Sequence, residues 1–112
     1  MFIETKRFIV KEGTSDLVVQ RFSGPGHIEQ SEGFIDLSVL VKRVRRGDEE
    51  VTVMIRWESE AAWKKWETSE VHIQGHRDSR GKPKPEHIIS VEHALYDVKS
   101  SKGAAPAVPV SE

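Results

Sequence analysis

Two runs that alternate between apolar and polar side chains constrain the fold most strongly. They read "GFIDLSVLV" and "VTVMIRW", and both lie within residues 33–57. β-branched side chains recur in each run, and a period of two is typical of strands with one face buried. The segment "RRGDEE" separates the runs, with Gly47 and Asp48 in positions suited to a turn. This part of the chain therefore predicts an antiparallel hairpin.

Strand patterns also occur near both ends of the chain. "FIETKRFIV", residues 2–10, places five side chains on one face of a strand: Phe2, Glu4, Lys6, Phe8 and Val10. The middle of this strand is unusually polar on both faces. "HIISVEHALYDVKS", residues 87–100, predicts a further strand near the C-terminus.

The segments between these strands predict helices. The first helix begins near Thr14 or Ser15 and stops at "GPG", residues 24–26. Its apolar face is expected to consist of Leu17, Val18 and Phe22. "SEAAWKKWETS" predicts a second helix with Ser59 as its N-cap, and Ser69 is placed to cap a third, short helix.

The order of these elements, β-α-β-β-α-(α)-β, predicts an α+β protein with a ferredoxin-like, split βαβ fold. The sheet is expected to be antiparallel, with its helices on one face. Apolar residues alternate on both faces of the strands, so the second face also needs a cover, and another copy of the same sheet would supply it. We therefore expect a homodimer of the dimeric α+β barrel type. Residues 1–102 form the expected domain, and residues 103–112 a flexible tail with few large side chains.

Composition excludes several classes of function. The formal net charge is −1, which provides no overall field for nucleic acid or a membrane surface. No apolar run approaches the roughly 20 residues of a membrane span, and charged residues interrupt the N-terminus before a signal sequence could form. The chain has no cysteine, which excludes disulfides and thiolate chemistry. We expect a cytoplasmic protein without a nucleic-acid or membrane partner.

The segment "WKKWETSEVHIQGH", residues 63–76, concentrates tryptophan and histidine. On one unbroken helix Trp66 and His76 would point about 80° apart and lie about 15 Å apart along the axis. Thr68 and Ser69 compete for backbone hydrogen bonds and predict a break between the two residues. A bent helix would let Trp66 and His76 form two walls of one cavity, whereas Trp63 is expected to belong to the core.

His72 and His76 are four residues apart, so a helix would place them on the same face. This spacing also occurs in two-histidine metal sites. The sequence offers no third ligand in a known pattern, and the pair alone is a weak signal.

Several motifs together resemble one known family. They are "VTVMIRWESEAAWKKWETSEVHIQGHRDSRGKPKP", "RRGDEE", "QRFSGPGHIEQSEGFIDLSVL" and "YDVK", and they span the chain from Met1 to about Lys102. The chain resembles the heme-degrading monooxygenases of the IsdG/IsdI class, most closely the HmoA type, within the antibiotic biosynthesis monooxygenase superfamily. The most specific match is the spacing of Trp66 and His76, which resembles the family's essential tryptophan and proximal histidine.

The resemblance implies a heme that is both cofactor and substrate, together with molecular oxygen and an external reductase or reductant. His76 would be the axial ligand of the heme iron, and Trp66 would press on the macrocycle and distort it. Lys6 stands where the family has a distal asparagine, and an ammonium group donates hydrogen bonds but cannot accept them. Trp66, His76 and Lys6 are thus the candidate catalytic residues, with Glu4 or Arg7 as possible substitutes for Lys6.

The segment "RFSGPGHI" corresponds to the family's loop beside the heme. Its candidate heme contacts are Arg21, Phe22, Gly26, His27 and Ile28, although a helix end and a turn would explain the same letters. Candidate partners for the propionates are Arg77, Arg80, Lys82 and Lys84. Two other functions remain open: a cofactor-free monooxygenase of a polycyclic aromatic substrate, and a dimer that binds heme without degrading it.

Overall fold

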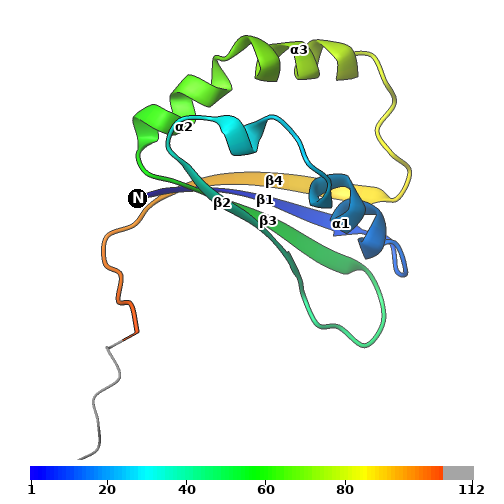
Figure 1. Ribbon diagram of the computed structural model, residues 1–112. Helices are drawn as coiled ribbons and strands as arrows, with labels where there is room; N and C mark the ends of the chain where they lie inside the picture. The colour runs from blue at the N-terminus through cyan, green and yellow to red at the C-terminus, as the bar shows by residue number, and fades with distance from the viewer. Residues whose placement is uncertain (105–112) are drawn as a thin grey trace, which may run out of the picture.

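The computed structural model describes residues 1–104 and contains a four-stranded antiparallel sheet. Its strands are β1 (Phe2–Val10), β2 (Phe34–Val41), β3 (Glu49–Trp57) and β4 (Ile88–Asp97), in the spatial order β2-β3-β1-β4. Figure 1 shows the open, twisted sheet that they form. The two central strands, β1 and β3, are distant in sequence, as in a split βαβ arrangement. The predicted α+β, ferredoxin-like fold and the predicted hairpin of β2 and β3 are confirmed.

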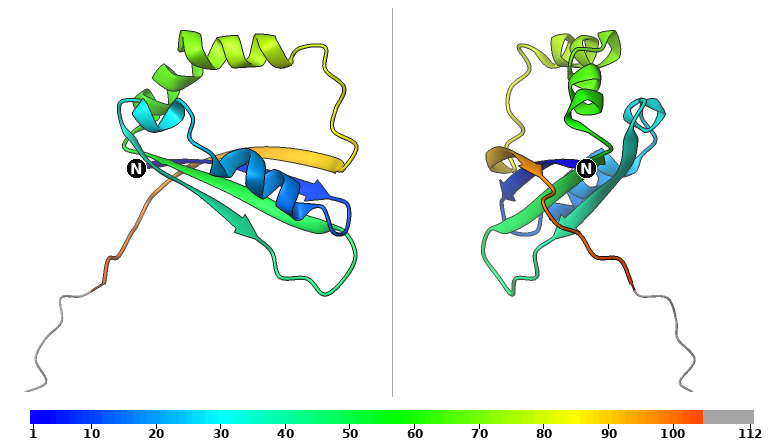
Figure 2. Two further views of the ribbon diagram at one scale, coloured as in Figure 1. Left: turned by 45° about the vertical axis from the view of Figure 1, so that its right-hand side comes forward. Right: turned by 90° about the vertical axis from the view of Figure 1, so that its left-hand side faces the viewer.

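The helices all lie over one face of this sheet, as Figure 2 shows. They are α1 (Ser15–Ser23), α2 (Glu60–Glu67) and α3 (Glu70–Ser79), and a 3-10 turn η1 (Ile28–Gln30) precedes β2. The turn η1 was not expected from the sequence. The other face of the sheet carries no helix within the described residues.

Side-chain caps explain why α2 and α3 are separate helices. Ser59 Oγ accepts a hydrogen bond from the N–H of Ala62 at 3.1 Å, and Ser69 Oγ accepts one from the N–H of His72 at 3.3 Å. Such caps satisfy N–H groups that have no partner inside the helix. At the end of α2 the N–H of Ser69 donates to the carbonyl of Trp66 at 3.0 Å, three residues back, and the hydroxyl of Thr68 donates to the carbonyl of Lys64 at 2.9 Å. Both predicted caps and the predicted break are confirmed.

The core lies between the helices and the sheet. The central strands β1 and β3 contribute every second residue, because paired residues of an antiparallel sheet share a face. In β1 the face with Phe2, Phe8 and Val10 is buried, and Trp57 of β3, paired with Phe2, is completely buried. Burying aromatic and β-branched side chains is the main stabilising contribution here.

One expectation for the core is wrong. Leu17 is 49% exposed, whereas α1 buries Val18 and packs Val19 and Phe22 against the core. At about 100° per residue, Val18, Val19 and Phe22 occupy one arc of the helix and Leu17 lies outside it. The sequence pattern predicted the helix correctly, but the buried face that it predicted differs from the observed one by about one residue.

The basic residues of the segment from Val41 to Arg46 are solvated at the end of a strand. β2 ends at Val41, and residues 42–48 form an exposed loop that reaches beyond the sheet (Figure 1). Gly47 has a φ of +89° in this loop, in agreement with the predicted turn. Within residues 1–104, no helix has the length and apolar character needed to cross a membrane. The expected tail lies almost wholly outside the described residues.

A close approach at Gly33 fixes α2 against the start of β2. Gly33 has a φ of +81°, and a Cβ atom there would lie 2.4 Å from the Cβ of Ala62. Its carbonyl accepts a hydrogen bond from the N–H of Glu58 at 2.8 Å, which ties the end of β3 to the same point. The position of α2 therefore depends on a residue without a side chain.

We expect Gly33→Ala to lower the free energy of unfolding by about 2–4 kcal/mol, because it combines an unfavourable φ with overpacking. Gly13→Ala is the matched control: its φ is +80°, but nothing lies within 4 Å of a new Cβ. Chemical denaturation of both variants measures the difference. Equal losses of stability in the two variants would show that the contact with Ala62 does not matter.

Candidate functional site

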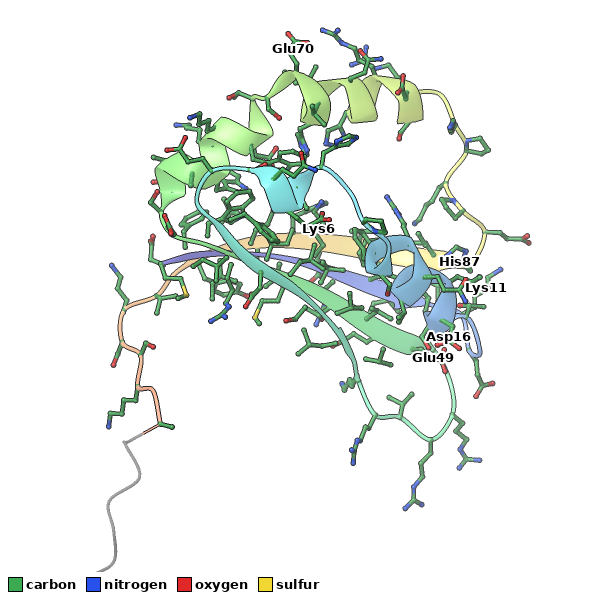
Figure 3. All side chains as sticks on the ribbon, viewed as in Figure 1. Lys6, Lys11, Asp16, Glu49, Glu70 and His87 are labelled. Atoms are coloured by element: carbon green, nitrogen blue, oxygen red, sulfur yellow. The ribbon has the colours of Figure 1, made fainter. Side chains whose placement is uncertain are left out.

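A cavity of about 400 Å³ lies between the sheet and the helices. Its walls come from β1, β2, β3, α1, α2 and α3, and from the segment that joins α1 to η1. Figure 3 shows Lys6 in the space between the sheet and the helices above it. Most candidate residues from the sequence line this cavity: Lys6, Arg21, Phe22, His27, Ile28, Trp66 and His76. The fold thus brings together residues from three separate parts of the chain.

Gly26 is the candidate that the structure does not bring to the cavity. Its N–H donates to the carboxylate of Glu29, with a distance of 2.9 Å to Oε2. Gly26 therefore belongs to the turn before η1. The four candidate partners for the propionates also do not line the cavity: Arg77, in α3, and Arg80, Lys82 and Lys84, after it. Lys84 donates to the carbonyl of Ile89 at 2.9 Å.

The break after α2 brings Trp66 and His76 to one cavity. Trp66 lies in the last turn of α2, and His76 lies in the last turn of α3, yet both line the same space. A single straight helix would have placed the two side chains about 15 Å apart along its axis. Trp63 packs instead on Phe2, with ring centroids 5.3 Å apart, so its expected place beside the core is confirmed.

His72 contacts both of these residues. Its ring centroid lies 5.1 Å from that of Trp66 and 4.4 Å from that of His76. The two histidine Nε2 atoms are 2.9 Å apart, and Glu67 Oε2 lies 3.1 Å from His72 Nε2. Burial lowers the pKa of His72, and the negative charge of Glu67 opposes this shift. Their spacing in the sequence placed the two histidines on one face but did not reveal these contacts.

Glu4 is a buried carboxylate on the wall of the cavity. Only 6% of the residue is exposed, and the other residues on the same face of β1 are mostly apolar. Burial raises its pKa, and the nearby charge of Lys6 partly opposes the rise. The indole N–H of Trp63 also lowers the pKa without reaching hydrogen-bond geometry. From the sequence, Glu4 was expected only as a substitute for Lys6; its position on a largely apolar strand face is the signal that marks it as a buried carboxylate.

We expect the stability of Glu4→Gln to differ from that of the wild type in a pH-dependent way. With a raised pKa, folded Glu4 holds its proton at a pH where the unfolded chain has lost it. The wild type therefore loses stability as the pH rises from about 4.5, the ordinary pKa, through the folded value. Glutamine has no such loss, so the variant should melt at a higher temperature at pH 7, and this gain should disappear at pH 4. An equal difference in melting temperature at both pH values would contradict the assignment.

Comparison with known proteins identifies the family. Residues 1–78 match the family model described as antibiotic biosynthesis monooxygenase. The chain belongs to this family. A heme-degrading monooxygenase, HmoA of Bacillus subtilis, is 56% identical over 102 residues, covering 91% of this chain and 94% of the relative. The resemblance inferred from the Trp66–His76 motif is thereby confirmed.

Two solved structures support the fold, and the first is described as an antibiotic biosynthesis monooxygenase. One, from Bacillus cereus, is 70% identical and has a TM-score of 0.84. The aligned region covers 95% of this chain and 98% of the Bacillus cereus chain. The other is MhuD, a heme degrader from Mycobacterium tuberculosis with two hemes bound in its active site. MhuD has 21% identity and a TM-score of 0.66. The aligned region covers 92% of this chain and 100% of the MhuD chain. At that identity, the likeness to MhuD concerns the fold alone.

Proposed function

We propose that this member of the antibiotic biosynthesis monooxygenase family is a heme-degrading monooxygenase, which opens the porphyrin ring and releases its iron. One observation carries the proposal: the broken helix places Trp66 and His76 on the walls of one cavity. The heme-degrading activity of HmoA, 56% identical over nearly the whole chain, supports it independently.

The residues around the cavity fit a heme. His76 is exposed on the cavity wall, and a histidine imidazole is a common axial ligand of heme iron. Trp66 offers a large, partly buried aromatic surface for the flat face of a porphyrin. Arg21, whose guanidinium carbon lies 5.1 Å from the ring centroid of Phe22, supplies a positive charge for a propionate. The lining thus combines an iron ligand, an aromatic wall and a cation.

The residues have distinct roles in this proposal. His76 would hold the heme iron through Nε2, Trp66 would pack against the flat face of the macrocycle, and Lys6 would donate hydrogen bonds from β1. Heme supplies the redox-active iron and the carbon skeleton that is oxidised, with molecular oxygen and electrons from an external reductase or reductant. His27, just before η1, and Ile28, its first residue, also border the space.

We also propose that the functional unit is a homodimer built from the domain of residues 1–102 and located in the cytoplasm. The uncovered face of the sheet supports the dimer, because it carries apolar side chains between charged ones. These apolar side chains are Ile3, Ile9, Leu40, Met54 and Tyr96. Ion pairs between Arg56 and Asp36 and between Arg7 and Glu92 cross the same face. A second sheet would bury both sets.

An aerobic hemin reaction tests the function. The apo-protein is titrated with hemin and the Soret band is followed to saturation, which we expect near one heme per chain. Ascorbate is then added in air with a ferrous chelator present. The band should bleach, the chelator should report iron, and mass spectrometry should detect an opened tetrapyrrole. A stable Soret band under reduction would favour a heme-sequestering dimer, and the absence of any band would favour a cofactor-free monooxygenase.

A further inference from the structure

We propose that His72 and His76 form a two-histidine chelate for a divalent transition-metal ion. Resting on the proposed function, we infer that this chelate receives the iron set free when the porphyrin opens. The first part concerns the apo-protein and does not depend on heme chemistry.

The geometry of the two imidazoles suits one ion. Metal–nitrogen bonds to histidine measure about 2.0–2.1 Å, so two ligands at a right angle on one ion lie about 3 Å apart. The Nε2 atoms of His72 and His76 are 2.9 Å apart. An ion placed between the lone pairs would replace the present contact between these nitrogens with small movements of the rings.

The helix holds the pair in this arrangement. Residues four apart lie one above the other on a helix, and α3 continues through both histidines from Glu70 to Ser79. Ser69 caps the helix through the N–H of His72, at 3.3 Å. The ring of His72 is also packed against Trp66, with its side chain only 13% exposed. One imidazole is therefore fixed by packing, while His76 remains exposed to incoming ligands.

The surroundings favour a hydrated, exchangeable ion. Both histidines line the cavity, and Glu67 Oε2, 3.1 Å from His72 Nε2, places a negative charge beside it. No set of three or more histidine, cysteine or acidic side chains in residues 1–104 is arranged to hold a metal ion. Water would fill the remaining positions, as at metal sites that keep open positions for exchange. Such a site would hold iron near its place of release without trapping it.

The chelate and heme would share one atom. In the proposed function, Nε2 of His76 binds the heme iron, and in the chelate the same nitrogen binds the free ion. The two ligands should therefore exclude each other, and a free divalent ion should inhibit hemin binding. A hydrogen bond between the imidazoles without metal affinity would explain the same contact but would not produce this competition.

Calorimetric titration of the full-length apo-protein with nickel chloride tests the chelate. We expect one Ni²⁺ per chain in the wild type and affinity reduced at least about tenfold in His72→Phe, which keeps an aromatic ring against Trp66. His76→Phe, at an exposed position, should show the same loss. His87→Phe is the matched control, because His87 does not line the cavity (Figure 3) and its loss should leave the affinity unchanged.

The competition is measured by repeating the titration after saturation with hemin. Binding of Ni²⁺ should then be lost in the wild type. No binding in the apo-protein, or equal binding in all variants, would overturn the chelate, whatever the outcome of the aerobic hemin reaction. Undiminished binding of Ni²⁺ to the hemin-saturated protein would contradict the claim that heme iron and the free ion share Nε2 of His76. Failure of hemin degradation with intact Ni²⁺ binding would instead contradict the proposed function.

Discussion

His76→Ala is expected to bind hemin at least about tenfold more weakly than the wild type, and to lose the spectroscopic signature of an iron–imidazole bond. The alanine removes the Nε2 atom that is expected to hold the iron. Because His76 is exposed, the substitution should leave the fold intact. Hemin titration followed by the Soret band measures the affinity, and resonance Raman spectroscopy of the ferrous complex detects the iron–histidine stretch. Free imidazole added to the variant should restore that signal.

The nearness of His72 requires a second variant. Its Nε2 lies 2.9 Å from that of His76, so it is close enough to take over the iron after a small ring movement. The double variant His72→Phe, His76→Ala removes both imidazoles. A wild-type spectrum in His76→Ala that disappears in the double variant would assign the ligand to His72. A wild-type spectrum in both variants would show that neither histidine of α3 binds the heme iron.

Trp66→Phe should retain hemin but degrade it about tenfold more slowly, which corresponds to about 1.4 kcal/mol of activation free energy. Phenylalanine keeps an aromatic surface but presents a smaller ring to the macrocycle, so it should distort the porphyrin less. The rate of Soret bleaching under ascorbate and air is the measurement, with hemin affinity determined separately.

Trp63→Phe is the matched control for that experiment. Trp63 lies in the same helix but packs on Phe2 beside the core, and it does not line the cavity. The substitution Trp63→Phe should lower the free energy of unfolding and leave the bleaching rate of the folded protein nearly unchanged. Equal rates in Trp66→Phe and the wild type would remove the tryptophan from the reaction.

Local sequence signals predicted most of the fold. Alternation with a period of two located the strands, and Ser59 and Ser69 marked the starts of α2 and α3. These signals act over a few residues and are therefore visible in the sequence. The same local reasoning located the break that brings Trp66 and His76 to one cavity.

Features that depend on tertiary packing could not be predicted. Leu17 is not on the buried face of α1, because that face is determined by how the helix packs on the sheet. The burial of Glu4 depends on helices that pack over β1 from distant parts of the chain. The contacts of His72 with Trp66 and Glu67 depend on the angle between two helices, which a cap residue does not determine.

A crystal structure of the heme complex tests the central claim most directly. We predict a porphyrin in the cavity between the sheet and the helices, with its iron bonded to Nε2 of His76 and its ring bent out of plane against Trp66. A planar porphyrin, or an iron bonded through a different side chain, would contradict the proposed roles of both residues.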